Sequence, residues 1–185
     1  LKNKIKAALL DAYKKKNRTD FAETMPAAAR FEPAPTMDGM LAQGAGVGLL
    51  ANSAMHPDIR SLRQLLLFGL KGMAAYADHA QILGKEDDEV YAFFHDTLDY
   101  LAREDFTVEE LVARNLKCGE INLKVMALLD AANTGAYGNP VPTKVRVTPV
   151  KGKAIVVSGH DLRDLEELLK QTEGTGINVY THGEM

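Results

Sequence analysis

The chain has 185 residues, of which 46% are apolar and 25% are charged, a composition that is ordinary for a globular protein able to bury a core. The formal net charge of -3 gives no reason to expect nucleic acid or an anionic membrane as a partner. The single cysteine, Cys118, excludes an internal disulfide and any metal site made from this chain's cysteines alone.

The sequence carries no recognisable targeting or membrane segment. No apolar run approaches the roughly 20 residues that span a bilayer. Residues 1–17 form a basic stretch that lacks the continuous apolar core of a secretory signal. We therefore expect a cytoplasmic protein. Because the chain begins at Leu1 rather than at methionine, we also expect it to be a piece of a longer protein.

The first third of the chain predicts little compact structure. Residues 1–17 are expected to form a helix with one apolar face among lysines. Residues 18–36 contain three prolines and little periodicity, which indicates a loop or extended connection. A short helix over residues 37–43 is predicted to follow.

Three strong amphipathic helices are predicted next, over residues 58–83, 88–103 and 108–132. Each has apolar side chains at three- and four-residue spacing. Thr107 and Glu110 have the spacing of a capping box, which would fix the start of the third helix. Helices joined by such short turns should pack as an antiparallel bundle.

Several residues within these helices could be structural or functional. Gly69 and Gly72 each cost about 1 kcal/mol relative to alanine inside a helix, so we predict close packing against another helix there. Cys118 lies on an apolar stripe and is expected to be a core residue rather than a nucleophile. Histidines at or within the helices have no partner at metal-binding spacing, so we expect structural or exposed roles for His56, His79 and His95.

The pattern changes to that of an α/β fold after residue 134. GAYGNPVPT is typical of a linker, and KVRVTPV (144–150) alternates as an edge strand would. The β-branched run at 153–158, a helix over 162–172 and a second run at 177–181 predict a β-α-β unit.

The predicted fold class is therefore α plus α/β. A helical bundle domain is expected over residues 1–143, with an irregular connection at 18–55. The first β-α-β unit of a Rossmann-like parallel-sheet domain, truncated, is expected over residues 144–185.

Polar side chains follow both predicted strands. Ser158-Gly159-His160-Asp161 comes after the first strand, and His182-Gly183-Glu184 comes after the second. Ligands collect at the carboxyl ends of parallel strands, so neighbouring strands would place His160 and Glu184 at one edge. Imidazole and carboxylate together can bind iron. In the alternative interpretation, Asp161 caps the next helix and His160 is a polar turn residue.

Three segments carry a family resemblance. DIRSLRQLLLFGLKGMAAYADHAQILG, CGEINLKVMALLDAANTGAYGNPVPTKV and, most specifically, KAIVVSGHDLRDLEELLKQTEGTGINVYTHGEM resemble the hybrid cluster protein (hydroxylamine reductase, or prismane protein) family. The resemblance is strong over residues 56–185, weak over the first helix and nearly absent over 18–55.

This resemblance implies an iron–sulfur oxidoreductase. Family members have a helical N-terminal domain followed by two α/β domains, with a hybrid iron–sulfur–oxo cluster where the domains meet. A second cluster, of the 4Fe-4S or 2Fe-2S type, is bound by N-terminal cysteines. The activity is reduction of hydroxylamine to ammonia with electrons from a donor protein, and a nitric oxide reductase role is also attributed to the family.

The resemblance also implies site residues. The S-G-H-D-L and T-H-G-E-M motifs supply two non-thiolate ligands of the hybrid cluster, and they match His160 and Glu184. His182 would be a second-shell or substrate-side group. The family's ligand cysteines are absent from this chain, so we expect the isolated fragment to be inactive.

Two alternatives remain at this point. The chain could be a cluster-free structural or interaction module, pairing with the rest of its own protein or forming a homodimer through bundle faces and open sheet edges. It could also be a carbon monoxide dehydrogenase-type relative, although the S-G-H-D-L and T-H-G-E-M motifs argue against this.

Overall fold

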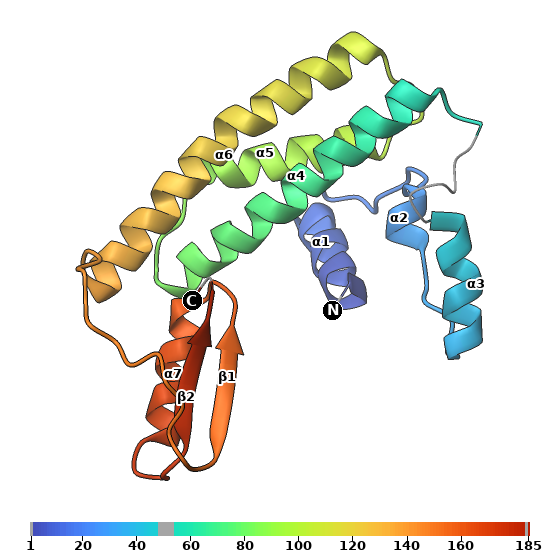
Figure 1. Ribbon diagram of the computed structural model, residues 1–185. Coiled ribbons are helices and arrows are strands. Elements are labelled where there is room, and N and C mark those ends of the chain that lie inside the picture. The colour runs from blue at the N-terminus through green and yellow to red at the C-terminus, as the bar shows by residue number, and fades with distance from the viewer. Residues whose placement is uncertain (1, 48–53, 184) are drawn as a thin grey trace.

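The computed structural model describes residues 2–47, 54–183 and 185. These residues form seven helices and one two-stranded parallel sheet (Figure 1). In chain order the elements are α1 (Lys2–Asn17), α2 (Ala27–Arg30), α3 (Met37–Val47), α4 (Pro57–Ile82), α5 (Asp88–Leu101), α6 (Val108–Tyr137), β1 (Ala154–Ser158), α7 (Leu162–Thr172) and β2 (Asn178–His182).

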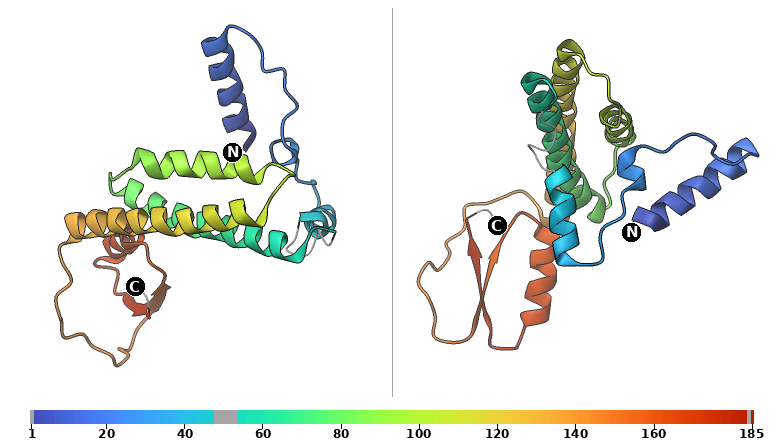
Figure 2. Two further views of the ribbon diagram at one scale, coloured as in Figure 1. Left: turned by 90° about the horizontal axis from the view of Figure 1, so that it is seen from above. Right: turned by 90° about the vertical axis from the view of Figure 1, so that its right-hand side faces the viewer.

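Helices α4, α5 and α6 form the predicted bundle. Successive helices run antiparallel, so α4 and α6 run in the same direction, side by side, and share the most extensive helix–helix contact (Figures 1 and 2). Among the described residues, every fully buried side chain lies in these three helices. The main core cluster consists of Leu66, Leu70, Met73, Ala77, Val90, Phe93, Tyr100, Leu111, Cys118, Ile121 and Val125.

Local signals fix where the bundle helices begin and end. The Thr107 hydroxyl accepts a hydrogen bond from the Glu110 N–H (3.2 Å), as the capping motif predicts. Gly84, at φ 78°, follows α4 as a left-handed stop. Helix α6 continues five residues past its predicted end, because the isolated Gly135 is tolerated at about 1 kcal/mol. It ends before Gly138, at φ 81°.

The close-packing interpretation of the α4 glycines is right for one of them. A Cβ at Gly69 would lie 2.8 Å from the Cys118 Sγ, so α6 approaches α4 too closely there for a larger residue. A Cβ at Gly72 would meet no atom within 4 Å, so the prediction is wrong at that position. Cys118 is buried beside Met73, with its Sγ 3.6 Å from the Met73 Sδ, and is a core residue as predicted.

The N-terminal helices contribute no fully buried residue. Helix α1 projects away from the bundle (Figure 2) and is held to the segment after it by Glu32, which accepts from Lys2 and Asn3 at 3.2 Å. Helix α2 begins at Ala27, directly after Pro26, in the stretch predicted to be irregular. Helix α3 runs four residues beyond its predicted end.

The predicted β-α-β unit is present. Strands β1 and β2 are parallel and paired from Ala154 with Asn178 to Ser158 with His182, and α7 lies along the sheet (Figure 2). The edge strand predicted at 144–150 is wrong. Residues 138–153 contain no helix or strand, and Val145 and Val147 are exposed. An alternating apolar pattern does not form a strand when no partner strand is available for hydrogen bonding, and prolines in the segment remove backbone donors.

Candidate functional site

The carboxyl ends of β1 and β2 point toward the C-terminal end of α4 (Figure 1). This is the edge at which ligands collect in open parallel sheets. The loop that joins β1 to α7 turns at Gly159, whose φ of 135° is one that residues with a side chain rarely adopt. The polar motif SGHD therefore lies at the junction between the sheet and the helical bundle.

His160 is an exposed residue of this loop. Its imidazole lies edge-on to the Tyr76 ring of α4, with the ring centroids 6.3 Å apart. The predicted ligand thus lies at the predicted strand end, with its ring in contact with the bundle. An exposed imidazole is accessible to a metal centre held by another part of a larger protein.

Asp161 caps helix α7, as the structural interpretation predicts. Its Oδ1 accepts hydrogen bonds from the N–H groups of Arg163 (2.9 Å) and Asp164 (3.1 Å). Its Oδ2 lies 3.8 Å from the His79 Nε2 of α4, an ion-pair distance when the histidine is protonated. The two side chains are mostly buried, at 22% and 20% exposed for His79 and Asp161. The cap of α7 therefore also links the α/β unit to the bundle.

Sequence reasoning gave His79 no site role, and it did not single out Tyr76. The two residues lie one turn apart on α4, with ring centroids 6.4 Å apart, and both face the loop after β1. The Nδ1 of His79 is buried without a hydrogen-bond partner. Their i, i+3 spacing was a signal that they share a helix face. The spacing does not predict that this face contacts the loop after β1, because that contact depends on the tertiary fold.

His182 ends β2 opposite Ser158. Its Nδ1 lies 3.3 Å from the Ser158 Oγ, with the donor set by the histidine tautomer. The second predicted ligand, Glu184, lies outside the described residues. Its approach to His160 therefore stays a prediction, and so does the role of His182 in supporting the ligands or facing the substrate.

A second contact joins the bundle to α7 away from the strand ends. The Tyr137 hydroxyl, at the end of α6, donates to the Glu166 Oε2 (2.9 Å). Hydrogen bonds from Lys170 and Tyr137 lower the pKa of the Glu166 carboxyl. Burial and this bond raise the pKa of the Tyr137 hydroxyl. The contact is structural and offers no metal donor beyond a carboxylate that is already paired.

The donor set is incomplete for an iron–sulfur cluster. Within the described part of the chain, no group of three or more His, Cys, Asp or Glu residues is placed to hold a metal ion. Cys118 lies in the α4–α6 core, and burial raises the pKa of its thiol, which disfavours the thiolate that binds metals. The described residues offer an exposed histidine and no available thiolate, so they do not fit a complete iron–sulfur cluster, which needs thiolate ligands.

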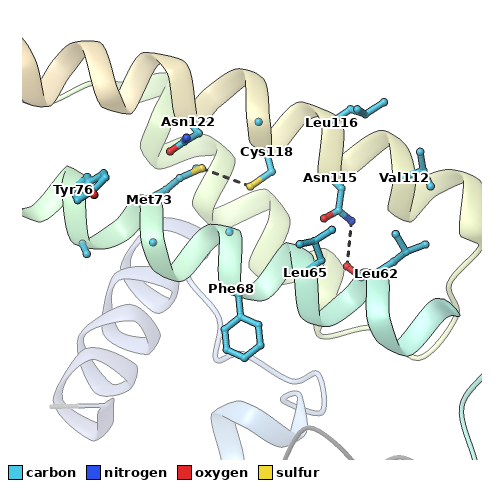
Figure 3. Close-up of a pocket in the computed structure, with 14 residues that line it drawn as sticks. Leu62, Leu65, Phe68, Met73, Tyr76, Val112, Asn115, Leu116, Cys118 and Asn122 are labelled. Atoms are coloured by element: carbon cyan, nitrogen blue, oxygen red, sulfur yellow. Dashed lines mark hydrogen bonds between the residues drawn. The ribbon is translucent and has the colours of Figure 1, made fainter. Parts of the chain in front are cut away.

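An apolar groove of about 710 Å³ runs between α4 and α6 (Figure 3). The two helices are linked across it by Asn115, whose amide donates to the Leu62 carbonyl (3.1 Å), and by the contact between Cys118 and Met73. The groove walls are mainly Leu62, Leu65, Phe68, Met73, Tyr76, Val112 and Leu116. Such walls suit packing against apolar side chains and offer no acid–base or metal chemistry.

The sequence matches the Prismane/CO dehydrogenase family over residues 3–185, nearly its whole length. The chain belongs to this family. It is 58% identical over 185 residues to a hydroxylamine reductase of Syntrophobacter fumaroxidans, covering 100% of the chain and 32% of that protein. It is 48% identical over 185 residues to a hydroxylamine reductase of Halothermothrix orenii, covering 100% of the chain and 33% of that protein.

A third relative is more similar over a shorter segment. The hydroxylamine reductase of Maridesulfovibrio salexigens is 64% identical over 128 residues, which is 69% of this chain and 24% of that protein. The chain thus spans about a third or less of the length of these curated relatives. None of the helices in the described ranges is long and apolar enough to cross a membrane.

Proposed function

We propose that this chain is the segment of a hydroxylamine reductase that joins the helical domain to the first α/β domain and supplies imidazole and carboxylate ligands to a hybrid iron–sulfur–oxo cluster. His160 and Glu184 are the ligands, and His182 is a neighbouring polar group. The whole protein reduces hydroxylamine, and by extension nitric oxide, with electrons from a donor protein. In this proposal the helical domain ends near residue 143.

The placement of His160 carries the proposal. Its imidazole is exposed, at the carboxyl end of a parallel strand, and beside the helical bundle. The register that pairs Ser158 with His182 puts this histidine of the second motif at the same edge, which supports the proposal. The matching family includes both prismane and CO dehydrogenase proteins, and the hydroxylamine reductase names of the relatives favour this chemistry over a carbon monoxide dehydrogenase-type role.

The incomplete donor set defines what the rest of the protein must add. Thiolate ligands would come from cysteines outside this chain, together with a second cluster that passes electrons. When bound, the hybrid cluster supplies electrons and an iron site for the nitrogen–oxygen substrate. This chain's contribution is to hold one edge of that site with His160, on the loop after β1, and with Glu184, which follows β2 in the sequence.

The test is substitution in the full-length protein that contains this chain. His160→Ala and Glu184→Ala should remove the electron paramagnetic resonance signals of the hybrid cluster and most hydroxylamine reduction, measured with a reduced dye as electron donor. His95→Ala is the matched control, because His95 is an exposed histidine of α5. Unchanged iron content and turnover in both site variants would show that the proposal is wrong.

The 185-residue chain by itself should act as a cluster-free structural module. No described group of residues can hold a metal ion without outside ligands, which favours this behaviour for the isolated chain. We expect purified chain to be colourless and to contain no stoichiometric iron after anaerobic reconstitution with iron and sulfide. A brown, iron-containing product would show that this chain binds a cluster unaided.

A further inference from the structure

Two side chains of the helical bundle meet the loop that carries His160. Tyr76 contacts the His160 ring edge-on at 6.3 Å between centroids, and His79 approaches the Asp161 carboxylate at 3.8 Å. Both come from the same turn of α4, which lies outside the β-α-β unit. The direction of the His160 ring is therefore set from across the junction as well as by its own loop.

We propose that Tyr76 and His79 are positioning residues that aim the His160 imidazole at the junction between the helical bundle and the sheet. The proposal rests on the ligand role of His160 proposed above. A ligand on a short loop is held in a productive direction by residues that do not themselves bind the metal.

The turn of α4 that carries these residues is a rigid base. Ala77 and Ala80, which flank them on the inner face, are 4% and 0% exposed, so the backbone is fixed by the bundle core. Tyr76 itself packs against the edge of that core. Side chains on a rigid helix define a direction more reproducibly than side chains on a loop.

The loop needs such support. Gly159 turns the chain with a φ of 135°, and His160 is the one residue between that turn and the cap of α7. On one side, Ser158 is fixed by strand pairing and by the His182 contact at 3.3 Å. On the other side, Asp161 is fixed by its two cap bonds and by His79.

The environment of His79 gives its ring a defined role. Its Nδ1 is buried with no hydrogen-bond partner, so among the described residues Asp161 is the polar partner that orients the ring through Nε2. Arg63 Nε, Thr97 Oγ1 and the Tyr100 hydroxyl share this unpartnered state, so the role of His79 is argued from its contact with Asp161.

Nuclear magnetic resonance of the histidine rings tests the proposal on the 185-residue chain. The chain has five histidines, so selective ¹³C,¹⁵N-histidine labelling gives five imidazole signals, assigned by single substitutions. Wild type should show nuclear Overhauser contacts between the Tyr76 and His160 rings. Tyr76→Leu and His79→Leu should each shift and broaden the His160 signal while the His56 and His95 signals stay in place.

Conservative and remote variants separate positioning from general loosening of the junction. Tyr76→Phe keeps the ring, and His79→Gln keeps a donor near Asp161, so both should retain the wild-type His160 signal. Tyr137→Phe removes a different link between the bundle and α7, the 2.9 Å hydrogen bond to Glu166, without changing the loop. It should also leave the His160 signal unchanged.

Absence of the Tyr76–His160 contact in wild type would overturn the proposal without any variant. An unmoved His160 signal in both leucine variants, with helix content intact by circular dichroism, would do the same. A shift of equal size in Tyr137→Phe would show that any loosened junction moves the loop, and would also contradict it.

The full-length protein distinguishes this proposal from the one on which it rests. Tyr76→Leu and His79→Leu should alter the shape of the hybrid-cluster paramagnetic signal while iron content is retained, whereas His160→Ala should remove the signal. If His160→Ala removes the signal and neither leucine variant changes it, the positioning proposal is wrong and the ligand role of His160 stands. If His160→Ala leaves the paramagnetic signal unchanged while the leucine variants shift the His160 ring signal, the ligand role is wrong and the positioning proposal stands.

Discussion

The helical bundle and the β-α-β unit differ in where their stabilisation comes from. The bundle buries leucine, isoleucine and aromatic side chains among α4, α5 and α6, whereas no residue of α7 is fully buried and the strands are half-buried at best. A two-stranded sheet with one helix has too few layers to enclose a core. The bundle therefore makes its own core, and the β-α-β unit depends on packing against neighbours.

This difference bears on the site, because the candidate ligand belongs to the weaker region. His160 follows β1, while its contacts Tyr76 and His79 belong to the stronger one. The proposed ligand thus lies on a loop that contacts a separate, well-packed scaffold. Binding residues on loops that a rigid scaffold positions are a common arrangement.

The largest effect should come from emptying the bundle core. Leu111 of α6 is 0% exposed, so Leu111→Ala should lower the free energy of unfolding by about 2–5 kcal/mol. Leu116→Ala on the same helix is the matched control, since Leu116 is 72% exposed and should change stability by less than about 0.5 kcal/mol. Urea unfolding followed by circular dichroism measures both. Equal effects would mean that the bundle core does not dominate stability.

A second effect should separate the two glycines of α4. Gly69→Ala places a methyl 2.8 Å from the Cys118 Sγ, and overpacking of about 1–3 kcal/mol outweighs a helix-propensity gain of about 1 kcal/mol. Gly72→Ala meets no atom within 4 Å and should stabilise the bundle by about 1 kcal/mol. Cys118→Ala should relieve the Gly69→Ala defect in a double-mutant cycle. Loss of stability in Gly72→Ala would contradict this assignment.

Most of the fold could be predicted from the sequence because its signals are local. Apolar periodicity located α4, α5 and α6, and Thr107 and Asp161 cap helices as their types and positions predict. The failures have a common cause. Residues 144–150 alternate like a strand but have no partner strand, and Gly72 lacks the close neighbour that Gly69 has. Both depend on which distant segments come into contact, and the local sequence pattern does not predict that.

The candidate site was predicted only in part. The position of His160 after β1 follows from strand periodicity, and its ligand role comes from the family resemblance. The roles of Tyr76 and His79 could not be read from sequence, because they lie more than 80 residues before His160 and meet its loop through the tertiary fold. Cys118 was assigned to the core because a lone cysteine on an apolar helical stripe is usually structural.

A smaller effect should show whether the two regions open separately. Asp161→Ala removes the cap of α7 and should destabilise it by about 1 kcal/mol, or roughly fivefold faster amide exchange. Asp161→Asn keeps a capping side chain and should restore protection. Thr107→Ala is the counterpart on α6. If Asp161→Ala speeds exchange in α4 and α6 as much as in α7, the two regions unfold as one unit and the comparison fails.

The last effect is measured as chemical reactivity and reports on the bundle core directly. Burial raises the pKa of the Cys118 thiol, and the thiolate is the form that reacts with iodoacetamide. Because burial raises the folded-state pKa of the thiol above the unfolded one, there is a pH window between the two pKa values in which the unfolded chain is alkylated and the native chain is protected. Mass spectrometry with and without urea measures this difference. Gly69→Ala crowds the Cys118 Sγ and should loosen the α4–α6 contact, so the difference in alkylation between native and unfolded chain should become smaller. Gly72→Ala should leave this difference unchanged. Rapid alkylation of the native wild type would place Cys118 at an accessible surface and contradict its assignment to the core.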